Sequence, residues 1–281
     1  MKAGLKKLMA LGLVAVLSIG LVGCGSKTAD TSGGGQPALE QIKKNGKLVV
    51  ATSPDYPPFE FMVSEGGKSN IVGADIDLAK KLAEKIGVEL EIKGMDFDAL
   101  LPALQAGKAD MVITGMTPNE ERKKAVDFSE IYFQGENAVV VNVKDAGKFT
   151  SEDQLKKAKI GVQKGSTQET YVKDNLKAEN FKSLTSVPDL ITDMKNGNLD
   201  AVVLNSKVAG INVGKYDGIK VVENLKLTNG GEEEAMAVAL KKGDNKDLVK
   251  LINEEIKALQ DSGEYDKILA NAVDLVSKET K

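Results

Sequence analysis

The side chains that could do chemistry in this chain are mainly carboxylates. Asp75 and Asp77 form one closely spaced pair, and Asp96 and Asp98 form another. Paired carboxylates can act together as general acid and general base. Each pair also lies at a predicted helix start, where an acidic side chain caps the helix and interacts favourably with its dipole. We therefore favour a structural role for the four aspartates and keep catalysis as the alternative.

The residue types on which most enzymes depend are scarce. The 281 residues include no histidine and one cysteine, Cys24. The sequence therefore lacks Ser-His-Asp and Cys-His nucleophile systems, histidine-ligated zinc, an internal disulfide and a CxxC redox pair. The formal charge of −3 gives no sign of the positive excess that nucleic-acid binding needs. We expect no metal, no cofactor and no nucleic-acid partner.

Two segments predict helix N-termini that follow a strand and a glycine. Residues 117–120 after Gly115 and residues 166–169 after Gly165 both have the Ser/Thr-x-x-Glu spacing of a capping box. In the first segment, Pro118 would occupy the first helical position. Free N–H groups at helix N-termini favour anions, and α/β sheets bind ligands at the carboxyl ends of their strands. Two such helix ends facing each other would suit a carboxylate.

These residues need a scaffold in which strands and helices alternate. Residues 48–53 form an apolar run typical of a strand, and residues 75–86 have apolar positions at helical spacing before Gly87. Residues 101–113 and 191–203 share one pattern, in which a helix stops at glycine and a turn leads through aspartate into a strand. The residues after position 36 would fill two lobes of about 120 residues each. We predict two similar α/β lobes, although the shared pattern is also a common αβ connection.

The N-terminal residues are typical of an exported protein. Three lysines precede an apolar run over residues 8–22, which as a helix would span about 22 Å, too short for the hydrocarbon core of a bilayer. We predict a signal peptide over residues 1–23, with a retained anchor helix as the alternative. The residues ending in Cys24 resemble the lipobox of bacterial lipoproteins, which implies a lipid on Cys24. Residues 24–36 would form a flexible tether.

Seven motifs follow one another along the chain, at residues 50–61, 73–78, 97–98, 102–110, 115–124, 126–129 and 161–167. Together with the lipobox, they resemble the polar amino-acid-binding lipoproteins of ATP-binding-cassette (ABC) importers, which are bacterial extracellular solute-binding proteins of family 3. The resemblance implies an α/β, two-lobed, periplasmic-binding-protein-like (type II) fold with crossing hinge strands near residues 132–136 and 232–236. Lobe 1 would comprise residues 37–133 and 237–281, and lobe 2 residues 134–236. Closure of the hinge would enclose the ligand.

The resemblance also implies which residues hold an amino acid. Arg122 would bind the α-carboxylate bidentately through its planar guanidinium. Further polar contacts would come from the backbone or hydroxyl groups of Gly115, Thr117 and Thr167. Tyr56 and Phe97 resemble the aromatic pair that sandwiches the ligand side chain in this family.

Three positions bear on the choice of ligand. Ser53 lies where binders of cationic amino acids tend to have an acid, and Gln163 is neutral. We therefore prefer a neutral polar amino acid as the ligand, although Asp55 and Glu60 keep a cationic one open. Asn205 lies where relatives usually have a carboxylate for the ligand ammonium, and an amide carries no charge to compensate it. Either one of the glutamates at residues 232–234 replaces that acid, or the ligand differs from the common ones.

The function implied is that of a binding protein and not of an enzyme. The chain would capture an amino acid between its lobes and deliver it to a membrane permease. The sequence contains no GxxxxGK[ST] motif, so a separate subunit would supply the energy. We expect a monomer outside the cytoplasm, lipid-anchored to the bacterial cell membrane. The alternatives are a dehydratase or lyase on the same fold that acts on a small carboxylic acid, and a surface sensor or interaction protein.

Overall fold

The computed structural model describes residues 37–228, 230–231 and 233–279. The predicted signal peptide, the lipidation site at Cys24 and the tether over residues 24–36 lie outside the described residues. Within the described part of the chain, no helix combines the length and apolar character needed to cross a bilayer.

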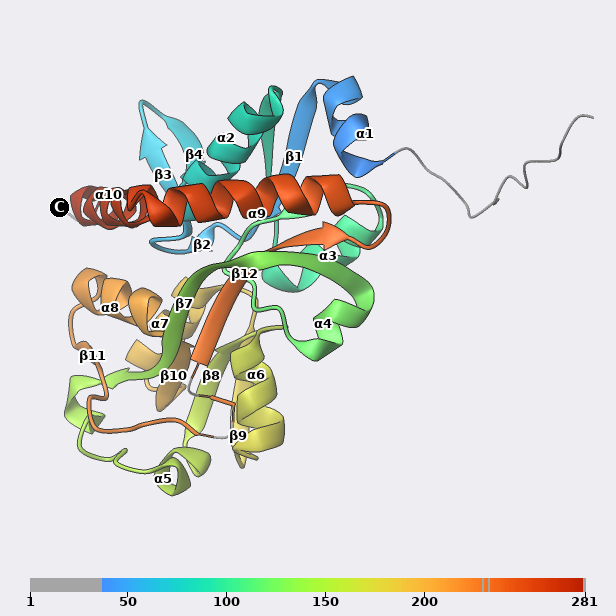
Figure 1. Cartoon of the computed structure of the whole chain (residues 1–281). Coiled ribbons are helices and arrows are strands. Elements are labelled where there is room, and N and C mark those ends of the chain that lie inside the picture. The colour runs from blue at the N-terminus through green and yellow to red at the C-terminus, as the bar shows by residue number, and fades with distance from the viewer. Residues whose placement is uncertain (1–36, 229, 232, 280–281) are drawn as a thin grey trace, which may run out of the picture. The chain divides into compact units, whose positions relative to one another are not determined.

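The strands follow one path, β5-β1-β6-β12-β7-β10-β8-β9, and β11 pairs with β7. Figure 1 shows β7 and β12 running between the two lobes. The first five of these strands form the sheet of lobe 1. They are β5 (Glu89–Gly94), β1 (Lys47–Thr52), β6 (Met111–Val112), β12 (Glu233–Lys241) and β7 (Val126–Asn142). β1 runs parallel to β5 and β6, whereas β12 runs antiparallel to β6 and β7.

Helices and a small second sheet complete lobe 1. The helices are α1 (Ala38–Asn45), α2 (Ala74–Ile86), α3 (Phe97–Gln105), α4 (Glu120–Ala125), α9 (Lys246–Asp261) and α10 (Glu264–Glu279). The small sheet has the order β2-β3-β4 and consists of β2 (Asp55–Tyr56), β3 (Glu60–Glu65) and β4 (Lys68–Val72). α2 agrees with the helix predicted from the apolar spacing, and Gly87 ends it in the left-handed conformation at φ 81°.

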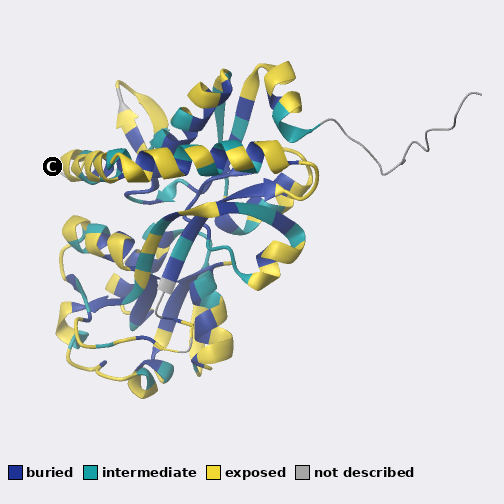
Figure 2. Ribbon diagram, in the orientation of Figure 1, coloured by how far each residue is buried: buried dark blue, intermediate teal, exposed yellow. Residues whose placement is uncertain are grey.

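Lobe 2 is a second α/β layer built around the far end of β7. Its strands and helices are η1 (Val143–Asp145), α5 (Glu152–Lys156), β8 (Lys159–Gln163), α6 (Thr167–Thr170), η2 (Tyr171–Asn175), β9 (Asn180–Leu184), α7 (Val187–Lys195), β10 (Ala201–Asn205), α8 (Ser206–Lys215) and β11 (Ile219–Val221). β10 is antiparallel to β7 and parallel to β8, which is parallel to β9. Figure 2 shows the strands of both lobes largely buried, with exposed residues on the outer helix faces.

The pattern shared by residues 101–113 and 191–203 has the same structure in both lobes. In each, a helix ends before a glycine of positive φ, and an aspartate then leads into a strand. Asp110 accepts a hydrogen bond from the Val49 N–H at 2.8 Å, and Asp200 accepts one from the Lys159 N–H at 2.8 Å. Each aspartate therefore ties its turn to the neighbouring parallel strand in the same way.

Two neighbouring strands connect the lobes. β7 runs without interruption from its pairing with β12 to its pairing with β10 and β11. The backbones of Glu233 and Met236 in β12 are paired with those of Glu136 and Phe133 in β7. The lobe boundaries after residues 133 and 236 stay a prediction.

Candidate functional site

A small cavity lies where the carboxyl ends of β1, β6 and β8 meet, and residues from both lobes line it. Its described lining comprises Ser53, Asp55, Tyr56, Glu60, Phe97, Thr114, Gly115, Thr117, Arg122, Gln163, Ser166, Thr167, Gln168 and Glu234. The carboxyl ends of parallel strands are the usual ligand sites of α/β sheets. All the site residues predicted from the sequence line this cavity except Asn205.

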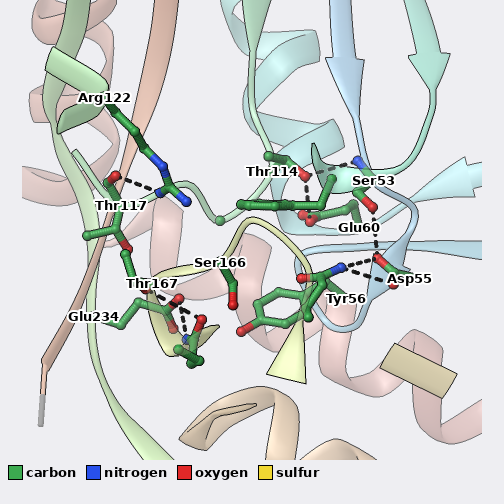
Figure 3. A pocket seen from close by; sticks show the side chains of 14 residues that line it. Ser53, Asp55, Tyr56, Glu60, Thr114, Thr117, Arg122, Ser166, Thr167 and Glu234 are labelled. Atoms are coloured by element: carbon green, nitrogen blue, oxygen red, sulfur yellow. Dashed lines mark hydrogen bonds between the residues drawn. The ribbon is translucent and has the colours of Figure 1, made fainter. Parts of the chain in front are cut away.

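Arg122 occupies one end of the cavity (Figure 3). Its guanidinium donates to the Thr117 carbonyl at 2.8 Å and, across to lobe 2, to the Gly165 carbonyl at 2.8 Å. The group also lies over the Phe97 ring, 5.5 Å from its centroid. Burial lowers the pKa of Arg122 to about 10, so the side chain stays charged at neutral pH.

The charge of Arg122 has no close counter-ion within the described residues. Its hydrogen-bond acceptors are the neutral carbonyl oxygens of Thr117 and Gly165, and among the described residues the carboxylates of Glu234 and Glu121 act on its charge from beyond ion-pair distance. A buried cation without an anionic partner is costly. The arrangement therefore leaves Arg122 available to a carboxylate that enters the cavity.

α4 begins later than the sequence predicts. The predicted capping box at residues 117–120 is wrong, because Asn119 is the N-cap and accepts from the Arg122 N–H at 2.8 Å. Pro118 consequently lies outside the helix. In lobe 2 the predicted N-cap, Ser166, does accept from the Glu169 N–H, at 3.1 Å.

Glu234 on β12 supplies a carboxylate near Arg122. Its Oε1 accepts from the Gln168 amide at 2.9 Å. Burial raises the pKa of Glu234. The Gln168 hydrogen bond, the nearby Asn205 amide and the charge of Arg122 oppose this rise. The Asn205 amide nitrogen is buried and has no hydrogen bond of normal geometry among the described residues. Glu234 is thus the acid from the predicted 232–234 group that the structure describes in the lining.

Asn205 is fully buried and does not belong to the lining. Its side-chain oxygen accepts from the Lys207 N–H at 2.8 Å and so caps α8. Its own N–H donates to the Tyr56 hydroxyl at 3.2 Å, which joins the two lobes. The side-chain oxygen and the backbone N–H of Asn205 are therefore engaged within the protein, whereas its buried Nδ2 has no hydrogen-bond partner among the described residues. The sequence could not reveal this, because the hydroxyl partner is 149 positions away.

The other end of the cavity is acidic. Asp55 accepts hydrogen bonds from the Ser53 hydroxyl at 3.0 Å, from the Gln163 amide at 3.2 Å and from the Val187 N–H at 2.8 Å. The last two donors belong to lobe 2, so Asp55 connects the lobes. Burial raises the pKa of Asp55, although these hydrogen bonds oppose the rise. Figure 3 shows Asp55 and Glu60 at the opposite end of the cavity from Arg122 and Glu234.

Glu60 is fully buried in the wall of the cavity. Its Oε1 accepts from the Thr114 hydroxyl at 2.9 Å, and that hydroxyl accepts from the Ser53 N–H at 3.0 Å. Burial raises the pKa of Glu60 well above its ordinary value, and the negative charge of Asp75 raises it further.

Asp75 does not cap its helix as expected. Its Oδ2 accepts from the Gly115 N–H at 2.8 Å and from the Tyr132 hydroxyl at 2.7 Å, and burial raises its pKa to about 6. Within the described structure, neither Asp75 nor the other three aspartates considered as acid/base pairs lines the cavity. A catalytic pair would have to reach the substrate, so this placement does not favour the enzymatic alternative.

Gly115 provides backbone at the centre of the cavity. Its φ is +57°, and a Cβ there would lie 3.4 Å from the Met236 Cε and 3.5 Å from the Tyr56 ring. Glycine is the residue that adopts this conformation without strain. The sequence did not identify Thr114, Ser166 and Gln168 as site residues. They line the cavity because segments far apart in the sequence pack together there.

Comparison with known proteins gives a family and several relatives. The model of the bacterial extracellular solute-binding proteins, family 3, matches residues 48–273. The arginine-binding extracellular protein ArtP of Bacillus subtilis is 36% identical over 267 residues, which cover 94% of this chain and 96% of the relative. The amino acid ABC transporter substrate-binding protein AbpA from Streptococcus pneumoniae, solved bound to L-arginine, is 40% identical with a TM-score of 0.81, over 84% of this chain and 98% of that one.

A further solved structure bears on the enzymatic alternative. The ancestral amino-acid-binding protein AncCDT-1, a precursor of cyclohexadienyl dehydratase, is 34% identical with a TM-score of 0.75, over 84% of this chain and 99% of that one. That neighbour is itself described as a binding protein.

Proposed function

Because the chain belongs to the bacterial extracellular solute-binding proteins of family 3, we propose that its cavity holds an α-amino acid with a basic side chain. The protein has the two-lobed type II fold. It is the extracellular substrate-binding component of an amino-acid ABC importer, which captures its ligand for a membrane permease.

The observation that carries the proposal is the distribution of charge along the cavity. One end has the buried Arg122 beside Glu234, and the other has Asp55 and Glu60. An α-amino acid carries a carboxylate and an ammonium on the same carbon, which match Arg122 and Glu234. A basic side chain extending from that carbon would then reach the acidic end.

The acidic end favours a basic ligand over the neutral polar one that the sequence predicts. Ser53 is neutral, as noted from the sequence, but it donates to Asp55, which lies in the lining together with Glu60. Two carboxyl groups in a small buried space are destabilising without a cation. The arginine ligands named for ArtP and AbpA are consistent with the same choice.

The proposal assigns roles to the remaining predicted site residues. Tyr56 and Phe97 would flank the ligand side chain, and Phe97 also stacks against Arg122. The polar contacts to the α-carboxylate would be completed from lobe 1 by Thr117 and from lobe 2 by Thr167. Thr117 supports this role because its buried Oγ1 has no hydrogen-bond partner among the described residues. Gly115 would offer its carbonyl to the ammonium, and the Gln163 amide would hold Asp55 in place.

We also propose that the protein does not catalyse a reaction and acts as a monomer attached to the membrane through a lipid on Cys24. The lipobox resemblance and the single cysteine support the attachment. Radiolabelled palmitate fed to the producing cells should label the wild-type protein and leave the Cys24→Ser variant unlabelled. Equal labelling of the two proteins, or none of the wild type, would count against a lipid on Cys24.

The ligand can be tested with a thermal-shift screen of the purified full chain against the twenty standard amino acids. A ligand at 100 times its Kd stabilises a protein by about 2.7 kcal/mol, which raises Tm measurably. We expect L-arginine and L-lysine to raise Tm and L-glutamate to leave it unchanged. No shift with any amino acid would contradict the proposed function, and a shift with neutral amino acids alone would contradict the basic ligand.

A further inference from the structure

The wall of the cavity contains a buried pair of carboxyl groups, Glu60 and Asp75. We propose that Glu60 and Asp75 share one proton in the unliganded protein and that a basic amino acid displaces this proton when it binds. Asp75 would then be a positioning residue, which acts on the ligand through Glu60 without touching it. This inference rests on the proposed function, because a cation must enter beside Glu60.

The first support is the hydrogen bonding of the two carboxyl groups. Glu60 Oε1 accepts from Thr114, and Asp75 Oδ2 accepts from Gly115 and Tyr132. The second oxygens, Glu60 Oε2 and Asp75 Oδ1, are both buried and receive no N–H or other O–H hydrogen bond from the described residues. The two side chains are neighbours, because they accept hydrogen bonds from the adjacent residues Thr114 and Gly115, and each carboxyl group acts on the pKa of the other.

Two ionised carboxylates cannot form a hydrogen bond with each other, because neither has a donor. A proton on one of them resolves this, as in other carboxyl dyads. Asp75 already accepts two hydrogen bonds on Oδ2, which stabilise its ionised form. Glu60 is therefore the member that carries the proton and donates it to Asp75.

The surroundings of the pair offer no cation within the described structure. The titratable groups that face it are Asp55 on β2, Tyr56 beside it, Tyr132 on β7 and Tyr265 on α10. All of these are acids or neutral at pH 7, and both tyrosine hydroxyls on β7 and α10 have raised pKa values because of burial. None of the described residues thus supplies a positive group to balance a second negative charge beside Glu60 and Asp75.

A basic ligand supplies that positive group. When its cationic end lies beside Glu60, ionisation of Glu60 becomes favourable, and the proton leaves to the solvent. The net charge of the site stays the same, because the cationic end of the ligand enters as one proton leaves Glu60. A neutral ligand has no such effect.

Isothermal titration calorimetry of the full chain tests the inference. The enthalpy of L-arginine binding is measured at pH 7 in buffers that differ in ionisation enthalpy, and the slope gives the protons released. We expect about one proton per L-arginine, and an affinity that rises by up to about tenfold per pH unit over the range in which the proton is released. L-glutamine, where it binds, should release none.

Asp75→Asn supplies the variant arm. The asparagine oxygen can still accept from Gly115 and Tyr132, while its amide can donate to ionised Glu60, so proton release and the pH dependence of affinity should disappear. Asp77→Asn is the matched control on the same helix, because Asp77 is 40% exposed and pairs with Lys80. The control should release as many protons as the wild type.

The outcomes separate this inference from the proposed function. L-arginine binding to the wild type without proton release overturns the inference and leaves the proposed function intact. Proton release that persists in a folded Asp75→Asn variant also overturns it. Absence of binding by every amino acid overturns the proposed function itself. The wild-type slope decides the inference even where a variant fails to fold.

Discussion

At the scale of single residues, Arg122 is the group on which ligand capture depends most directly. It is buried, charged and bonded only to the neutral carbonyls of Thr117 and Gly165. We expect Arg122→Ala to weaken amino-acid binding by roughly 30- to 4000-fold, since loss of one partner of a desolvated pair costs about 2 to 5 kcal/mol. Calorimetry measures the change. Lys123→Ala, at an exposed neighbour that pairs with Glu120, serves as control and should bind normally.

Glu234 carries a second prediction at this scale. If its carboxylate pairs with the ligand ammonium, Glu234→Gln keeps the shape and removes the charge. The loss of a charge-assisted hydrogen bond costs about 1.5 to 3 kcal/mol, which corresponds to a roughly 10- to 150-fold rise in Kd. Glu223→Gln changes an acid that is 79% exposed and should leave Kd as it is. If Glu234→Gln binds the ligand as tightly as the wild type does, another group must pair with the ligand ammonium.

At the scale of elements, the contacts between lobes determine how firmly the cavity is closed. The Tyr56 hydroxyl of lobe 1 accepts from the N–H of Asn205, at the end of β10 in lobe 2. Both residues are buried. Closure therefore depends on this hydroxyl, because an N–H buried without an acceptor is costly.

Tyr56→Phe tests that dependence. The Asn205 N–H would lose its acceptor in the closed form alone, at a cost of about 1 to 3 kcal/mol, so Kd should rise by about 5- to 150-fold. The free energy of unfolding of the unliganded protein should change little if its lobes are open. Calorimetry and urea unfolding provide the two measurements. A large loss of unliganded stability with unchanged Kd would show that the hydroxyl serves the fold and not closure.

The elements also show what sequence reasoning could and could not reach. α2 and its glycine stop follow from local spacing, and the matching turns at Asp110 and Asp200 follow from a local pattern. The contacts of Asp75 with Gly115 and Tyr132 join residues 40 and 57 positions apart. Contacts at such separations leave no local pattern in the sequence. The position of Asp75 at a helix start therefore predicts a helix cap, which is wrong.

At the scale of the whole molecule, the buried acids make the stability of the fold depend on pH. Burial raises the pKa of Asp75 from 3.8 to about 6 and also raises the pKa of Glu60 well above its ordinary value. The folded state therefore binds more protons than the unfolded state between about pH 4 and 6, and these groups destabilise the fold as the pH rises through that range. Acids with lowered pKa values, such as Glu91, act in the opposite sense only below about pH 4.5.

We expect the Tm of the unliganded protein to be higher at pH 5 than at pH 7.5. Asp75→Asn should reduce this difference, because asparagine does not titrate. Differential scanning calorimetry at the two pH values measures it. The exposed-site variant Asp77→Asn should keep the wild-type difference, and a Tm that falls on acidification to pH 5 would mean that other groups dominate.

β7 belongs to both sheets as one unbroken strand of 17 residues. Side chains alternate between the faces of a strand, so inserting one residue near Gly135 would reverse the facing of every later β7 side chain against β10 and β11. A change in length at that point therefore alters packing throughout lobe 2. The same change in a surface loop alters only the loop. A chimera that joins a different second lobe to this first lobe would need the same number of residues along β7. Without that match, cavity side chains from the second lobe would not face the first.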